Sequence, residues 1–255
     1  MKSLTETILD QSTAIRTRIL PEVLDRVGLI KTQFDSTNPY NTQIIDWLSP
    51  IVDLTGFHVY PTNGITEGLN WWYRGETRGV QMNLGDYQWI DPTGNHLHYQ
   101  SVPSSIDGNY CQYPTDKPVA LDLAYVGSTS IQKIPIHNNV ERVFYSLSKS
   151  FGVRNIRTGW YFTRQEDQKL NQLTFGAKYY NYFAHDVAET IISNFTIDYV
   201  WNRLRSEQQR VCQLLNLTPS DSVFLGTSTD PIYSKFRRNN NEARVCLAGV
   251  YNYGT

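Results

Sequence analysis

The chain has 255 residues, of which 40% are hydrophobic and 18% charged, so it can bury a sizeable core in one large domain or in a domain with a small appendage. Its formal net charge of -1 argues against a nucleic-acid or anionic-membrane partner, and its three cysteines and five histidines lack the spacing of a disulfide framework or a metal site. No apolar run has the length of a membrane span or the form of a signal peptide, which predicts a cytoplasmic protein.

Helical and strand patterns follow one another along the first two thirds of the chain. Apolar residues recur at helical spacing between residues 4 and 30, with an interruption at Pro21, and predict an N-terminal helical arm over residues 1–35. Short apolar runs then alternate with helical stretches, and the expected strands cover residues 56–60, 79–84, 96–100, 119–125 and 143–145. This alternation predicts an α/β domain over residues 36–186, with a mainly parallel sheet between layers of helices.

The last third of the chain has a different pattern. A broad apolar face runs from about Val187 to Leu215 and predicts one long connecting helix. Two strand-like runs, residues 223–226 and 243–249, follow Pro219. Residues 187–255 are therefore expected to form the connecting helix and a reduced C-terminal small domain.

Lys149 lies in a segment that combines an amine with groups able to hold a phosphate. It follows the apolar run that ends at Tyr145, so it is expected on the loop at a strand end, where open α/β sheets bind ligands. Ser146 and Ser148 offer hydroxyls, and Arg157 offers a planar fork suited to bidentate phosphate binding. A lysine in this position can form a Schiff base with a carbonyl cofactor, although an exposed lysine on a polar loop is the plain alternative.

Two further segments complete a candidate pocket for an aromatic aldehyde phosphate. Gly64, Ile65 and Thr66 lie in a turn between a strand and a helix, where exposed amides can bind an anion, though an ordinary helix start has the same pattern. Asp122 lies within an apolar strand, and a buried carboxylate requires a cation such as a protonated ring nitrogen. Tyr125 can donate to a ring oxygen; the alternative is a turn aspartate beside a core tyrosine.

Arg244 lies between two apolar runs near the end of the chain. An arginine in that setting requires an anionic partner, for which a substrate α-carboxylate is suitable. A surface arginine on an edge strand is the alternative. Aromatic residues at 71–73, 179–180 and 182 favour core or interface packing over a substrate pocket.

Together these segments resemble, in the same order, those of the fold-type I pyridoxal-phosphate enzymes of the aspartate aminotransferase superfamily. The matching residues are Asn63-Gly64-Ile65-Thr66-Glu67, Asp122-x-Ala124-Tyr125, Ser146-x-Ser148-Lys149-x-Phe151-Gly152-x-x-Asn155-x-Arg157-x-Gly159 and Arg244-x-x-x-Ala248-Gly249. The resemblance implies a sheet of the seven-stranded type and pyridoxal 5'-phosphate as cofactor. It also implies an aminotransferase that moves an amino group between an amino acid and a 2-oxo acid through an internal aldimine on Lys149.

The resemblance also implies a role for each matching residue. Lys149 corresponds to the lysine that holds the cofactor and shuttles the proton, Asp122 to the partner of the pyridine nitrogen, and Tyr125 to the donor to the phenolic oxygen. Tyr87 corresponds to the aromatic that stacks on the ring, and Arg244 to the ligand of the α-carboxylate. The phosphate ligands correspond to Gly64, the Ile65 and Thr66 amides, Ser146, Ser148 and Arg157.

Tyr40 resembles the tyrosine that reaches the phosphate of the neighbouring subunit, which implies a homodimer with shared active sites. Relatives usually carry an Asn-Pro-x-Gly motif, and Ser105 here stands in place of its asparagine, with a weaker contact to the phenolic oxygen. The chain is also shorter than typical members and ends soon after Arg244. These departures leave two alternatives, a pyridoxal-phosphate-dependent decarboxylase or β-eliminating lyase, and a catalytically silent cofactor-binding protein.

Overall fold

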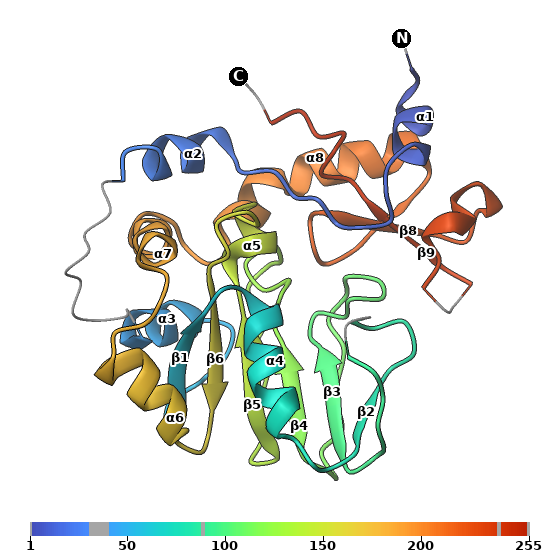
Figure 1. The fold of residues 1–255 in the computed structure, drawn as a ribbon. Helices are drawn as coiled ribbons and strands as arrows, with labels where there is room; N and C mark the ends of the chain where they lie inside the picture. Colours follow the sequence, from blue (N-terminus) through green and yellow to red (C-terminus); the bar gives the residue numbers. More distant parts are fainter. Residues whose placement is uncertain (1, 31–40, 88–89, 239–240, 254–255) are drawn as a thin grey trace.

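A six-stranded sheet with the strand order β1-β6-β5-β4-β3-β2 forms the centre of the molecule (Figure 1). The computed structural model describes residues 2–30, 41–87, 90–238 and 241–253. The strands from β2 to β5 run parallel, whereas β6 is antiparallel to both of its neighbours. The strands are β1 (His58–Thr62), β2 (Val80–Met82), β3 (Leu97–Ser101), β4 (Val119–Asp122), β5 (Val140–Tyr145) and β6 (Gly159–Thr163).

The mainly parallel α/β sheet is confirmed, but within the described ranges it has six strands and not the seven that the resemblance implied. β3, β4 and β6 are buried at every position, as expected for strands covered on both faces. β6 is not among the predicted strands, although its run Trp160-Tyr161-Phe162 is aromatic and therefore typical of a strand.

Helix α4 (Ile65–Gly75) begins directly after β1 and packs against β5 and β6. Gly68 allows this close approach, because a Cβ atom there would lie 3.2 Å from the Phe144 ring and 3.3 Å from the Tyr161 side chain. The packing holds the first turn of α4 at one end of the sheet. The short helix α5 (Leu147–Ser150) follows β5 at that same end (Figure 1).

The predicted connecting helix over residues 187–215 is wrong as a single element. The structure has two helices, α7 (Tyr182–Asn194) and α8 (Tyr199–Leu215), separated at Phe195, whose backbone is extended with φ -131° and ψ 137°. The indole of Trp47 donates to the Phe195 carbonyl at 2.8 Å, so a side chain from another helix engages the backbone at the break. An apolar face that continues through both helices conceals this break in the sequence.

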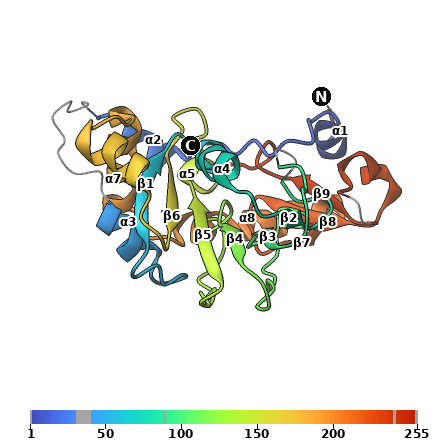
Figure 2. The same cartoon turned by 60° about the horizontal axis from the view of Figure 1, so that its bottom comes forward.

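The remaining elements surround the large sheet. A second antiparallel sheet, with the order β7-β8-β9, lies beyond the β2 and β3 side of the large sheet (Figures 1 and 2). It corresponds to the two strand-like runs predicted near the C-terminus, while the division of the chain into three domains stays a prediction. The other elements are α1 (Leu4–Leu9), α2 (Pro21–Val27), α3 (Asn41–Leu48), α6 (Gln168–Asn171), the π-helical turn Gln172–Gly176, the 3-10 helix Pro231–Phe236, β7 (Thr218–Pro219), β8 (Leu225–Ser228) and β9 (Ala243–Cys246).

The N-terminal arm is only partly helical. Between α1 and α2 the chain is not helical, and it runs beside α5 along the upper end of the large sheet (Figure 1). The Thr17 hydroxyl donates to the Ser148 carbonyl at 3.3 Å, which fixes this segment to α5. Pro21 starts α2 at its first helical position, where the missing N–H costs no hydrogen bond.

None of the helices in the described ranges is long and apolar enough to cross a membrane.

Candidate active site

Lys149 lies in a small cavity at the carboxyl ends of β4 and β5. These strands are parallel neighbours, so the residues at and after their ends are brought to one edge of the sheet. The Lys149 Nζ atom lies 4.3 Å from the centre of the Tyr125 ring. The cavity has a volume of about 120 Å³ and is lined by Ile15, Asp86, Tyr87, Ser105, Tyr125, Lys149, Arg238 and Arg244.

Asp122 is the buried carboxylate that ends β4. Its side chain is held by two donors, the Tyr99 hydroxyl at 2.6 Å from Oδ2 and the Ala124 amide at 2.7 Å from Oδ1. Burial raises the pKa of Asp122, while the charge of Lys149 and these two hydrogen bonds oppose that rise. No salt bridge joins Asp122 to a cation in the described ranges. The carboxylate therefore remains able to pair with a cationic group brought in by a ligand.

The surroundings of Lys149 favour the protonated amine. Burial by itself lowers the pKa of Lys149, but the neighbouring Tyr125 hydroxyl and the charge of Asp122 outweigh burial and the repulsion from Arg244, so the pKa lies above its ordinary value. An amine acts as a nucleophile only after it has lost its proton. The site thus stores a proton on Lys149 that must be transferred before the amine can react.

Two of the predicted phosphate ligands, Gly64 and Arg157, meet where α4 begins. Gly64 has φ +79°, and a Cβ atom there would lie 2.8 Å from Nη2 of Arg157, so only glycine lets the arginine approach the helix N-terminus. Gly159 is equally restricted, since its Cβ would lie 2.7 Å from the Gly64 Cα atom. The Thr66 hydroxyl lies 2.9 Å from the Tyr87 hydroxyl, which connects this end of the site to the Lys149 cavity.

Two buried hydroxyls in the site lack protein partners. They belong to Ser148 and Tyr125, neither of which has a hydrogen-bond partner for its hydroxyl among the described residues. Ser146, three residues before Lys149, is buried as well. Buried hydroxyls are nearly always satisfied, so these two groups are suited to contact a polar ligand. Arg157, in contrast, is exposed in this chain.

Arg244 enters the cavity from β9 and is 5% exposed. Its guanidinium donates to two backbone carbonyls, those of Ser105 and Thr13, the latter at 3.4 Å, and its Nε atom has no partner within the described chain. Carbonyl oxygens do not neutralise its charge. Arg244 is therefore poised to bind an anion, and the alternative of a surface arginine is wrong.

Asp86 and Tyr99 are site residues that were not predicted. Asp86 is buried, and its carboxylate accepts hydrogen bonds from the Ser101 amide at 3.1 Å and from the Ser101 and Ser105 hydroxyls at 2.6 Å each. The Ser105 hydroxyl, expected to face the cofactor, is thus engaged by Asp86. Asp86 precedes the predicted Tyr87 in the sequence, but its contacts with Ser101 and Ser105 form only in the fold, and the Tyr99 contact depends on how β3 lies against β4. Tyr40 lies outside the described residues.

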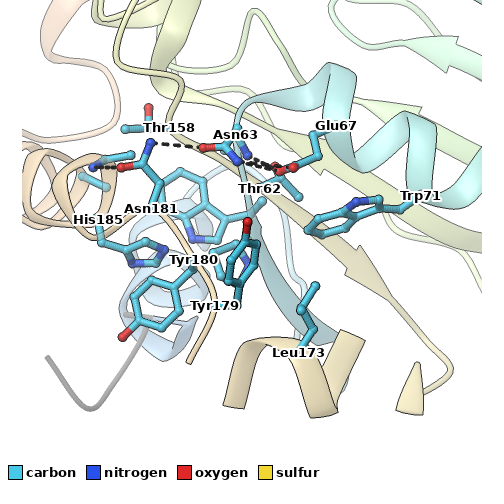
Figure 3. A pocket seen from close by; sticks show the side chains of 15 residues that line it. Thr62, Asn63, Glu67, Trp71, Thr158, Leu173, Tyr179, Tyr180, Asn181 and His185 are labelled. Carbon is cyan, nitrogen blue, oxygen red and sulfur yellow. Dashed lines mark hydrogen bonds between the residues drawn. The ribbon is translucent and has the colours of Figure 1, made fainter. Parts of the chain in front are cut away.

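A separate, larger cavity of about 430 Å³ is lined by Asn63 and Thr158, the sequence neighbours of Gly64 and Arg157 (Figure 3). Glu67 accepts hydrogen bonds from the backbone and side-chain amides of Asn63, and Asn181 donates to the Asn63 side chain at 3.1 Å. Trp71 and Tyr179 also line this cavity and not that of Lys149, and Tyr179 is exposed. The expectation that the aromatic residues serve core or interface packing and not a substrate pocket stays a prediction.

Comparison with known proteins gives structural likeness without sequence likeness. No protein-family profile and no curated protein matches the sequence. Histidinol-phosphate aminotransferase from Sinorhizobium meliloti, solved in complex with pyridoxal-5'-phosphate, has a TM-score of 0.63 at 13% identity, with 96% of this chain and 90% of that chain covered. A pyridoxal-phosphate-bound C-S lyase from Staphylococcus hominis has a TM-score of 0.65 at 11% identity, with 97% and 92% covered.

A third similar structure is L-threonine-O-3-phosphate decarboxylase from Porphyromonas gingivalis, with a TM-score of 0.61 at 12% identity and coverage of 92% of this chain and 94% of that chain. At such low identities the likeness establishes the fold alone. The three proteins are named for different reactions, so the shared fold does not select among them.

Proposed function

We propose that this chain, which has the fold of the pyridoxal-phosphate enzymes of fold type I, binds pyridoxal 5'-phosphate and transfers an amino group between an amino acid and a 2-oxo acid. The observation that supports this most directly is the placement of Lys149 beside Tyr125 in a cavity that also contains Arg244, with Asp122 buried next to it. The bound cofactor in two of the similar structures supports the same cofactor here.

The residues present fit this cofactor. The unpartnered hydroxyls of Ser148 and Tyr125 match a phosphate and a phenolic oxygen, and the buried Asp122 carboxylate matches a protonated ring nitrogen. Gly64 lets the Arg157 guanidinium lie against the N-terminus of α4, where amides favour an anion. Because the Ser105 hydroxyl already donates to Asp86, Tyr125 is the better donor to the phenolic oxygen of the cofactor.

When bound, pyridoxal phosphate supplies an aldehyde for the lysine amine and an electron-withdrawing ring. Asp122 stabilises a proton on the ring nitrogen, because its own ionised form is buried and gains from a cationic partner. Lys149 Nζ, once deprotonated, would take the proton from the substrate Cα atom and deliver it to the aldehyde carbon of the cofactor, C4′, as amino transfer requires. Arg244 binds the substrate α-carboxylate and so holds the substrate against Lys149.

The first test asks whether Lys149 carries the cofactor. Purified protein is incubated with pyridoxal 5'-phosphate, reduced with borohydride and digested, and the modified peptide is identified by mass spectrometry. We expect modification at Lys149, none in Lys149→Ala, and unchanged modification in the control Lys169→Ala, whose lysine is exposed on α6. No modification at Lys149 in the wild type, or labelling of the whole protein that is the same in the wild type and in Lys149→Ala, would refute the proposal.

The second test separates the possible reactions. The loaded protein is incubated with a panel of amino acids and no acceptor, and the cofactor form and released products are measured. Accumulation of pyridoxamine phosphate supports amino transfer. Release of carbon dioxide, or of ammonia with the cofactor retained, would instead support a decarboxylase or an eliminating lyase, and no turnover with a labelled Lys149 would identify a silent cofactor-binding protein.

A further inference from the structure

A second arginine lies in the Lys149 cavity together with Arg244. Arg238 lines the same space of about 120 Å³, in which the lining includes one carboxylate, Asp86. The oxygens of that carboxylate already accept hydrogen bonds from two serines. No salt bridge joins Arg238 or Arg244 to a carboxylate among the described side chains. The cavity therefore has more cationic than anionic groups on its wall.

Arg238 also lines a second cavity, of about 400 Å³, that shares Asp86 and Tyr87 with the first. The rest of its wall is formed by residues 82–85 and 90–92 and by Arg237. Asp91 and Arg237 are exposed there, whereas Arg238 is half-buried between the two cavities. A molecule held at Lys149 therefore has room to extend past Arg238.

The two guanidinium groups influence each other electrostatically. Burial and then the charge of Arg244 lower the pKa of Arg238, while Tyr125 and Asp86 oppose this effect. Like charges that share a partly dry cavity repel, and an anion between or beside them removes the penalty. An amino acid brings one α-carboxylate, which needs one arginine. The other arginine is available to a second anionic group.

We propose that Arg238 binds a second anionic group, a carboxylate or a phosphate, on the side chain of the amino-acid substrate. This inference rests on the proposed function, because it assigns the α-carboxylate to Arg244. It names a substrate class, amino acids with an anionic side chain, and makes Arg238 a specificity-determining residue. The larger adjoining cavity accommodates the part of the side chain that lies beyond this second anion.

The test measures binding directly, so that it does not depend on turnover. Butyrate, succinate and 3-phosphonopropionate are titrated by calorimetry into protein loaded with pyridoxal phosphate. We expect at least one of the two dianions to bind about tenfold or more tightly than butyrate, as one charge-assisted contact implies. Arg238→Gln is expected to abolish that preference and leave butyrate binding unchanged. Whichever dianion binds more tightly identifies the second group as carboxylate or phosphate.

The matched control is Arg210→Gln, which removes an exposed arginine of α8 that pairs with Glu207. Arg210→Gln should keep the full preference for the dianions over butyrate. Arg238→Lys retains the charge without the planar fork, so this variant should keep part of the preference. If Arg238→Gln unfolds, Arg238→Lys takes its place. Equal binding of butyrate and both dianions to the wild type, or an unchanged preference in Arg238→Gln, would overturn the inference.

The borohydride labelling of Lys149 on the same preparations separates the two proposals. Labelling without a preference for dianions overturns the role of Arg238 and leaves the cofactor assignment intact. A preference for dianions without labelling overturns the proposed function and leaves Arg238 as an anion-binding residue.

Discussion

The hydrogen bond between Tyr99 and Asp122 shows how a single residue can tune a buried charge. The bond is 2.6 Å long and both groups are buried. Burial raises the pKa of Asp122 above the ordinary 3.8, and the bond from Tyr99 lowers it again. The charge-assisted part of this bond therefore stabilises the fold only above the native pKa of Asp122, and it is lost as the pH falls through that value.

We predict that Tyr99→Phe lowers the free energy of unfolding by roughly 2 kcal/mol at neutral pH, the usual contribution of a hydrogen bond to a charged group. The loss should shrink as the pH approaches the ordinary carboxyl pKa of 3.8. Urea unfolding at both pH values measures this. The control is Tyr233→Phe, because the buried Tyr233 hydroxyl donates to a neutral carbonyl at 2.8 Å and its loss should not depend on acidic pH. The same pH-independent loss in both variants would contradict the prediction.

At the residue scale, the sequence identifies groups whose chemistry is unusual for their position. Three charged residues lie next to apolar runs: Lys149, Asp122 and Arg244. The structure brings Lys149 and Arg244 into one cavity, and Asp122 is close to Lys149. Asp86 and Tyr99 were missed because their contacts depend on the register of β3 and on the loop after β2, which no local pattern encodes. Arg238 follows a helix that itself was not predicted.

At the element scale, the segment between α1 and α2 acts as a strap over the site. Ile15 lines the Lys149 cavity, the Thr13 carbonyl accepts from Arg244, and Thr17 bonds to α5. Gly152 has φ +73°, and a Cβ atom there would lie 2.3 Å from the backbone of Arg18. The strap can lie in this position only because residue 152 has no side chain.

We predict that Gly152→Ala displaces the strap. The free energy of unfolding should fall by the cost of backbone strain and by a further ~1–3 kcal/mol, which is typical of overpacking. Limited proteolysis should also cut the strap more rapidly in the variant than in the wild type. Gly56→Ala is the matched control, since Gly56 has φ +82° with nothing within 4 Å of the added Cβ, and it should show the strain without faster cleavage. Equal stability losses and equal cleavage rates in the two variants would show that the strap is not held by this contact.

The elements differ in how well local sequence predicts them. The strand β4 and the second half of β5 were predicted because buried strands form apolar runs, whereas β3 was predicted from the alternation of polar and apolar residues although all of its positions are buried. The break between α7 and α8 was not, because it is associated with a contact from Trp47, which is distant in the sequence. The same holds for the arm, where tertiary contacts of the strap override the helical pattern.

At the scale of the whole molecule, the phosphate side of the site is open in a single chain. Arg157 is exposed, and the residue after it, Thr158, lines the 430 Å³ cavity (Figure 3). We propose that a second copy of the chain covers this side and that its Tyr40 contacts the phosphate, as the family resemblance implies. Half of each active site would then depend on the other subunit, which mixed dimers can reveal.

We predict that Lys149→Ala and Tyr40→Ala are each strongly impaired as homodimers, and that mixing them under exchange conditions restores activity. The hybrid dimer contains one site with both Lys149 and the partner chain's Tyr40 intact, whereas its other site lacks both. The control pairs Lys149→Ala with Arg157→Ala, because Lys149 and Arg157 serve the same site of one chain and every hybrid site lacks one of them. Activity and sedimentation are measured on each mixture. No restoration in the mixture with Tyr40→Ala, or a monomer in sedimentation, would exclude a site shared through Tyr40, because a Tyr40 that acts across the interface must complement Lys149→Ala. Restoration in both mixtures would contradict the placement of Lys149 and Arg157 in the same site of one chain.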